Sequence, residues 1–159
     1  MPAFFANIPL WVAPLFLGLL FISLRATRPR TVPKAVIYGL PLLGFLTLRT
    51  LASLTPLGFA LSAFALAYVA GAAVGSRAQG AWTIATTRSH VRLCGEWLTM
   101  VTIMGVFVLN FANGTINAIA PQLAETALYV GAFSILAGVL SGIFFGRALR
   151  VMRIPVVAA

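Results

Sequence analysis

Five long apolar segments constrain this chain more than any other feature of its sequence. Each is about as long as the roughly 17–25 residues that a helix needs to cross the hydrocarbon core of a membrane. Their apolar residues are continuous, and a backbone in lipid must satisfy its own hydrogen bonds, so helices are favoured over strands. We therefore predict an all-α integral membrane protein, a single membrane domain over residues 1–159 with five transmembrane helices. The five predicted spans are 8–24, 35–53, 57–75, 97–113 and 126–146.

The composition excludes a soluble globular protein. Hydrophobic residues make up 61% of the chain and charged residues 8%, whereas a soluble domain carries about 25% charged residues. A chain with so few charged side chains cannot cover a surface that faces water.

The small inventory of reactive side chains argues against an enzyme. The chain has no Asp, and its Glu, His and Cys residues are Glu96, Glu125, His90 and Cys94. Paired carboxylates, two haem-ligating histidines and a Cys-x-x-Cys pair are therefore all missing. A zinc site needs three or four ligands, which the chain cannot assemble alone. We predict no catalytic residue, no metal and no cofactor.

The distribution of basic residues predicts the orientation. If the N-terminus lies outside, the three cytoplasmic segments hold ten of the eleven Lys and Arg residues, and the three outer segments hold none. This is a strong positive-inside bias, so we expect a cytoplasmic C-terminus. Attraction to anionic lipids explains the positive charge better than a nucleic-acid partner does. The cytoplasmic segments are 25–34, 76–96 and 147–159, and the outer segments are 1–7, 54–56 and 114–125.

Residues 77–96 form the longest polar segment. Its alternation of apolar and polar residues predicts a short cytoplasmic β-hairpin between the third and fourth helices. A lone hairpin is marginal in water, so we expect it to lie against the helix ends, with Arg77, Arg88 and Arg92 facing anionic lipid. Glu96, at the start of the fourth helix, suits the positive end of the helix dipole and can also pair with one of these arginines.

Arg49 is the one ionisable residue inside a predicted span. It lies near the outer end of the second span, and Glu125 opens the fifth span from the same side. We predict an Arg49–Glu125 ion pair, because an unpaired charge at this depth is costly. The alternatives are that Arg49 reaches the outer lipid phosphates alone, or that it belongs to an anion or substrate site.

Small residues recur at every fourth position in two spans. Such ridges let helix backbones approach closely, so we predict helix packing, either within one chain or between copies of it. The residues are Gly71 and Gly75 in the third span, and Ser134, Gly138, Gly142 and Gly146 in the fifth.

Three asparagines, Asn110, Asn113 and Asn117, gather around the outer end of the fourth span. Asparagine is common in helix C-caps and turns, which is one interpretation. The other is that the three amides line the mouth of a polar pathway.

Four short motifs stand out along the chain: I-P-L-W-V (Ile8 to Val12), R-P-R-T-V (Arg28 to Val32), V-R-L-C-G-E-W-L (Val91 to Leu98) and G-R-A-L-R (Gly146 to Arg150). Together they resemble motifs of small bacterial inner-membrane proteins of unknown function and, more loosely, of CcdC-like membrane proteins. The resemblance implies several helices, a small polar element before the fourth helix and a bacterial inner membrane, and it implies no activity.

These observations predict a non-catalytic accessory or structural protein of the inner membrane. Its partners would be the lipid bilayer, anionic lipids and either a second copy or another membrane protein. The alternative is a small channel or transporter with a polar path near Arg49, Asn110 and Glu125.

Overall fold

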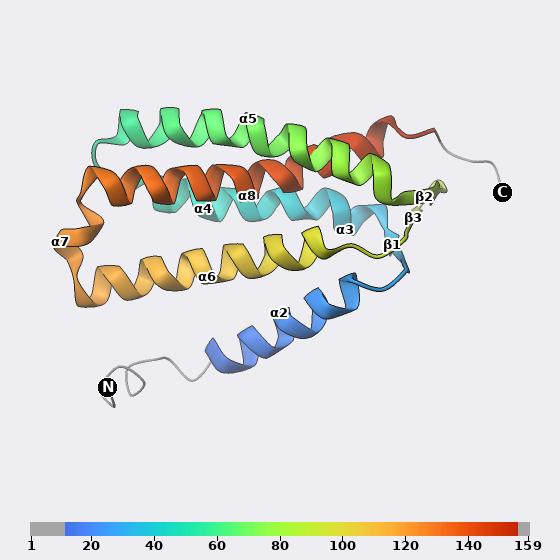
Figure 1. Cartoon of the computed structure of the whole chain (residues 1–159), viewed down its shortest axis with the longest axis horizontal. Helices are drawn as coiled ribbons and strands as arrows, with labels where there is room; N and C mark the ends of the chain where they lie inside the picture. Colours follow the sequence, from blue (N-terminus) through green and yellow to red (C-terminus); the bar gives the residue numbers. More distant parts are fainter. Residues whose placement is uncertain (1–11, 156–159) are drawn as a thin grey trace.

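The chain folds into a bundle of long helices with a small sheet at one end (Figure 1). The structure, a computed structural model, describes residues 12–155, apart from the side chains of Leu43, Phe45 and Leu46. Residues 8–11 of the first predicted span lie outside the described residues. The elements are α2 (Val12–Ala26), β1 (Arg30–Pro33), α3 (Lys34–Gly39), the 3₁₀ turn η1 (Leu40–Leu42), α4 (Leu43–Ala52), α5 (Leu57–Trp82), β2 (Thr83–Thr86), β3 (His90–Leu93), α6 (Trp97–Ile119), α7 (Pro121–Ala124) and α8 (Ala127–Arg153).

Four helical segments are long and apolar enough to cross a membrane. They are the continuous run of α3, η1 and α4 over Lys34–Ala52, then α5, α6 and α8. Each overlaps one of the last four predicted spans. The first predicted span falls on α2, which is apolar but has 15 residues in the described part of the chain.

Three helices extend beyond the predicted spans. Helices α5, α6 and α8 continue to residues 82, 119 and 153, whereas the predicted spans end at residues 75, 113 and 146. Hydropathy falls where polar side chains begin, but the backbone stays helical beyond that point. The 26 residues of α5 reach about 39 Å at about 1.5 Å per residue, more than the roughly 30 Å of a hydrocarbon core. Residues predicted in loops, such as Arg77 and Arg147, therefore lie on helices.

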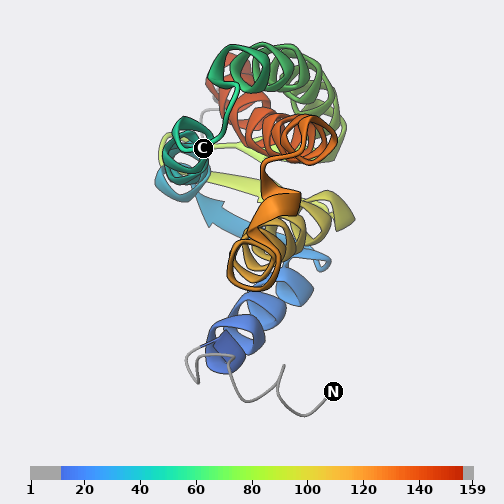
Figure 2. The ribbon, with the colours of Figure 1, turned by 90° about the vertical axis from the view of Figure 1, so that its left-hand side faces the viewer.

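Helices α5 and α8 lie side by side and form the closest contact in the bundle (Figures 1 and 2). A Cβ atom on Gly142 would meet the carbonyl oxygen of Tyr68, and one on Gly71 would meet the main chain of Val139. Only glycine permits backbones to approach this closely. The two glycine series thus face each other within one chain. Gly75, Gly138 and Gly146 make the same kind of approach.

The other helices join this pair on one side, and α2 lies farthest from it (Figure 2). Leu51 and Leu54, at the end of the Lys34–Ala52 run and just after it, pack with Phe64 of α5 and Val130 of α8. Helix α2 packs on α6, where the rings of Phe16 and Phe107 are 5.5 Å apart.

The sheet has three antiparallel strands in the order β1-β3-β2. The sequence predicted the β2–β3 hairpin but missed β1, in which Val32 pairs with Val91. A four-residue strand that ends in proline carries little signal, because proline cannot donate to a ladder and is confined to edges. Val91 and Leu93 are buried against Ile37 and the end of α8. This end of the bundle is called the sheet end below, and the opposite end the α7 end.

Candidate functional site

A tight connection between β3 and α6 places Glu96 inside the bundle. Gly95 has φ = 89°, a left-handed conformation that glycine adopts without steric cost. A Cβ atom there would also meet the carbonyl oxygen of Thr27. The N–H of Glu96 donates to the carbonyl oxygen of Ala26 at 3.0 Å. The chain is thus held between the end of α2 and the start of α6, with the carboxylate buried.

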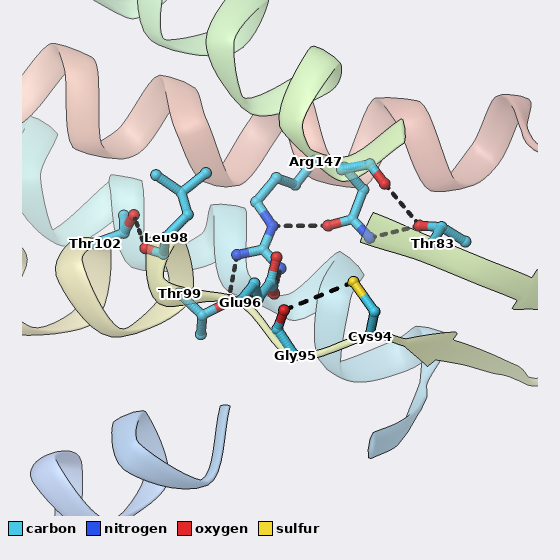
Figure 3. Close-up of polar contacts among 9 residues, drawn as sticks. Thr83, Cys94, Gly95, Glu96, Leu98, Thr99, Thr102 and Arg147 are labelled. Carbon is cyan, nitrogen blue, oxygen red and sulfur yellow. Dashed lines mark hydrogen bonds and ion pairs between the residues drawn. The ribbon is translucent and has the colours of Figure 1, made fainter. Parts of the chain in front are cut away.

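Arg147 of α8 reaches this carboxylate and joins three helices (Figure 3). Its Nη2 donates to Glu96 Oε1, its Nη1 to Thr99 Oγ1 at 2.6 Å, and its Nε to Gln79 Oε1 at 2.8 Å. Thr99 Oγ1 donates in turn to Glu96 Oε1. Gln79 Nε2 donates to Thr83 Oγ1 at 2.9 Å, which connects α5 to the first residue of β2.

Burial makes this network energetically important. Arg147 is 1% exposed, Glu96 2% and Gln79 0%. Moving two charges out of water is costly, and their attraction compensates only where further hydrogen bonds satisfy the remaining polar atoms. Thr99 and Gln79 provide such bonds to Arg147, and Thr99 also donates to Glu96 Oε1. These residues hold α5, α6, α8 and the hairpin together. The network of Glu96, Arg147, Thr99 and Gln79 is called the polar lock below.

A second arginine, Arg30 of β1, lies near the lock. The pKa of Arg30 is lowered, because burial disfavours its charged form. The negative charge of Glu96 offsets part of this shift. In the described residues, Arg30 Nε and Glu96 Oε2 are buried atoms without a hydrogen-bond partner. A guanidinium keeps its proton at neutral pH, so Arg30 supplies a second positive charge close to the carboxylate.

The sequence predicted other partners for Glu96, and this prediction was wrong. Arg88 and Arg92 are exposed on the hairpin. Arg77 is exposed on α5 and does not belong to the hairpin. The partner is Arg147, which the sequence places in the predicted cytoplasmic segment 147–159. It lies 51 residues after Glu96 along the chain. One signal was present in the sequence: Glu96 is the only acid among the predicted cytoplasmic segments, and Arg147 is the first basic residue after the last apolar run.

The predicted Arg49–Glu125 pair does not form. Within residues 12–155, the one ion pair is Glu96–Arg147. Arg49 lies on an exposed position of α4, and Glu125 is exposed just after α7, a short helix that the sequence did not predict. The protein therefore covers neither side chain.

The three asparagines lie on α6, which continues past them to Ile119, so the C-cap interpretation is wrong. Asn110 Nδ2 donates to the carbonyl oxygen of Val106, and Asn117 Nδ2 to that of Asn113, both at 2.8 Å. The hydroxyl of Tyr129 donates to Asn113 Oδ1 at 2.7 Å. These amides bond to their own helix and to α8.

No protein-family model, curated protein or solved structure matches this chain. The resemblance to CcdC-like membrane proteins therefore stays a prediction.

Proposed function

We propose that this chain is a non-catalytic, multi-pass protein of the bacterial inner membrane that acts as an accessory or structural protein. Its α2 helix and its four long apolar segments cross the membrane, with the N-terminus outside and the sheet end in the cytoplasm. The basic surface at the sheet end meets the anionic inner leaflet and a partner membrane protein.

The grouping of charge supports this orientation. The ten basic residues other than Arg49 occupy the end of α2, strand β1 with the residues that flank it on both sides, the end of α5, the hairpin and the end of α8. These segments meet at the sheet end of the bundle (Figure 1). Basic residues concentrate on the cytoplasmic side of inner-membrane proteins.

The buried Glu96–Arg147 lock is the observation that carries the proposal. It joins α5, α6 and α8 directly beside the sheet, so the segments that bear the basic residues are held in fixed relative positions. A fixed, charged surface suits a protein that docks to lipid and to a partner. The polar residues of the channel alternative, Arg49 and Glu125 among them, are instead exposed or bonded to their own helix.

Fusion reporters test the orientation. A green fluorescent protein fused to the C-terminus should fluoresce, and alkaline phosphatase fused there should be inactive, because the sheet end lies in the cytoplasm. The matched control is a phosphatase inserted between residues 53 and 56, which connect α4 to α5 and should lie outside, so this enzyme should be active. An active C-terminal phosphatase would show that the orientation is reversed.

Reconstitution separates the accessory role from the channel alternative. Purified protein in liposomes that contain pH- and chloride-sensitive dyes should give no flux above that of empty liposomes, because an accessory protein has no conducting path. Purification from membranes in a mild detergent should in turn retain a defined membrane protein. Flux that disappears in an Arg49→Gln variant would establish the channel instead.

A further inference from the structure

A groove of about 570 Å³ lies between the ends of α5 and α8 at the sheet end. Arg77 lines it from α5, and Arg150 and Arg153 line it from α8. Residues three or four positions apart share one face of a helix, so Ser76 and Gly80 stand on the same side of α5 as the groove. Three cations from two helices therefore border one hollow.

These three arginines carry positive charge that is not neutralised by the protein. None of them forms an ion pair in residues 12–155, and the groove has no acidic residue among its lining residues. Glu96, the nearby acid of the sheet end, is already bonded to Arg147. Cations that border one groove repel one another, so an anion in the groove lowers the electrostatic energy.

Gly80 shapes the floor of the groove. A Cβ atom on Gly80 would lie 2.9 Å from Arg150 Nε. The guanidinium of Arg150 thus lies directly against the backbone of α5, where any larger residue would displace it. A planar guanidinium held at the edge of a hollow matches the geometry of a phosphate, which it binds through two parallel hydrogen bonds.

We propose that this groove binds the phosphate of an anionic phospholipid headgroup. The proposal rests on the proposed function, because the cytoplasmic orientation puts the groove at headgroup depth in the anionic leaflet. Ala72, Ala73 and Leu149 give the groove an apolar side, which suits the glycerol and upper acyl region of a lipid. A basic pocket between transmembrane helices on the cytoplasmic side is a form that such lipid sites take.

Native mass spectrometry of the detergent-purified protein tests the site. The probe is phosphatidylglycerol, compared with phosphatidylcholine of the same acyl chains and with inorganic phosphate. We expect the wild-type protein to retain one phosphatidylglycerol in preference to phosphatidylcholine, and inorganic phosphate not to displace it. The variant Arg77→Gln/Arg150→Gln/Arg153→Gln should bind on the order of 100-fold more weakly, since each arginine near anionic lipid contributes about fivefold.

A charge-matched variant is the control. Arg28→Gln/Arg88→Gln/Arg92→Gln removes three exposed arginines of the sheet end that do not line the groove, and it should keep the bound lipid. Gly80→Leu keeps every charge but fills the groove, and it should also lose the lipid. The Arg150 side chain is flexible and can move aside, so this variant tests the site even if the triple groove variant does not fold.

Equal weakening in the two triple variants would overturn the site, because affinity would then follow net charge alone. Displacement by inorganic phosphate would overturn the lipid as occupant, and so would unchanged binding in Gly80→Leu. The measurement is made in detergent and does not depend on orientation. If the fusion reporters show the reversed topology, only the proposed function is contradicted. If the topology is as expected but both triple variants bind the lipid equally weakly, only the groove site is contradicted.

Discussion

Replacing Arg147 with methionine should destabilise the protein by about 3–5 kcal/mol, because the change leaves the buried carboxylate of Glu96 without its partner. Glu96→Leu should cost a similar amount by leaving the guanidinium unpaired. The double variant should lose less than the sum of the two, with a coupling energy of about 1–3 kcal/mol. Unfolding in mixed micelles with increasing dodecyl sulfate, followed by tryptophan fluorescence, gives the four free energies.

Arg49→Leu, Glu125→Leu and their double variant form the matched control. These residues are also one arginine and one acid, but both are exposed and they do not pair. Their effects should be small and should add. If the losses in unfolding free energy at Glu96 and Arg147 simply add, the two residues are not coupled and the polar lock is contradicted. If the losses at Arg49 and Glu125 do not add, those two residues interact, which contradicts their separation in the structure.

The double variant Gly142→Ala/Gly146→Ala should be destabilised by about 4 kcal/mol, taking about 1–3 kcal/mol for each overpacked site. The added Cβ atoms would meet the carbonyl oxygens of Tyr68 and Ala72. These are main-chain atoms of α5, so the clash can be relieved only by moving the two helices apart. The same detergent unfolding experiment measures the loss, and circular dichroism shows whether the helices themselves persist.

Gly18→Ala/Gly114→Ala is the control for this change. A Cβ atom at either position has open space within 4 Å, so the higher helix propensity of alanine should leave stability unchanged or raise it by about 0.5–1 kcal/mol per site. If the two double variants behaved alike, the close contact between α5 and α8 would not contribute to stability as proposed.

The glycine contact and the polar lock depend on each other. Gly146 and Arg147 are consecutive, and the approach of α8 to α5 at Gly146 brings Arg147 Nε within 2.8 Å of Gln79 Oε1. Separating the helices should therefore also weaken the hydrogen bonds of the guanidinium. We expect part of the loss in the glycine variant to arise at the lock.

Much of the fold could be predicted from local patterns in the sequence. Continuous apolar runs located the four long helices, because burial in lipid or in a core requires apolar side chains at every turn. Alternation of apolar and polar residues within 77–96 located the β2–β3 hairpin, because successive side chains of a strand point to opposite faces. Both signals depend only on neighbouring residues. They do not show where polar residues continue a helix, which is why α5, α6 and α8 extend beyond the predicted spans.

The partners of the buried charges were decided only by the tertiary structure. Glu96 and Arg147 are 51 residues apart. The position of Arg147 directly after the last apolar run sets it apart from Arg150 and Arg153, but no local pattern shows that its side chain turns inward to meet Glu96. Their meeting depends on how far α8 is rotated and how closely it packs on α5, which the glycine contacts determine over many residues at once. The sequence by itself therefore determined that the chain forms long apolar helices with basic residues grouped beside them. The packing of those helices determined which arginine is buried with the carboxylate and which three are left to line a groove, because burial is a property of the assembled bundle.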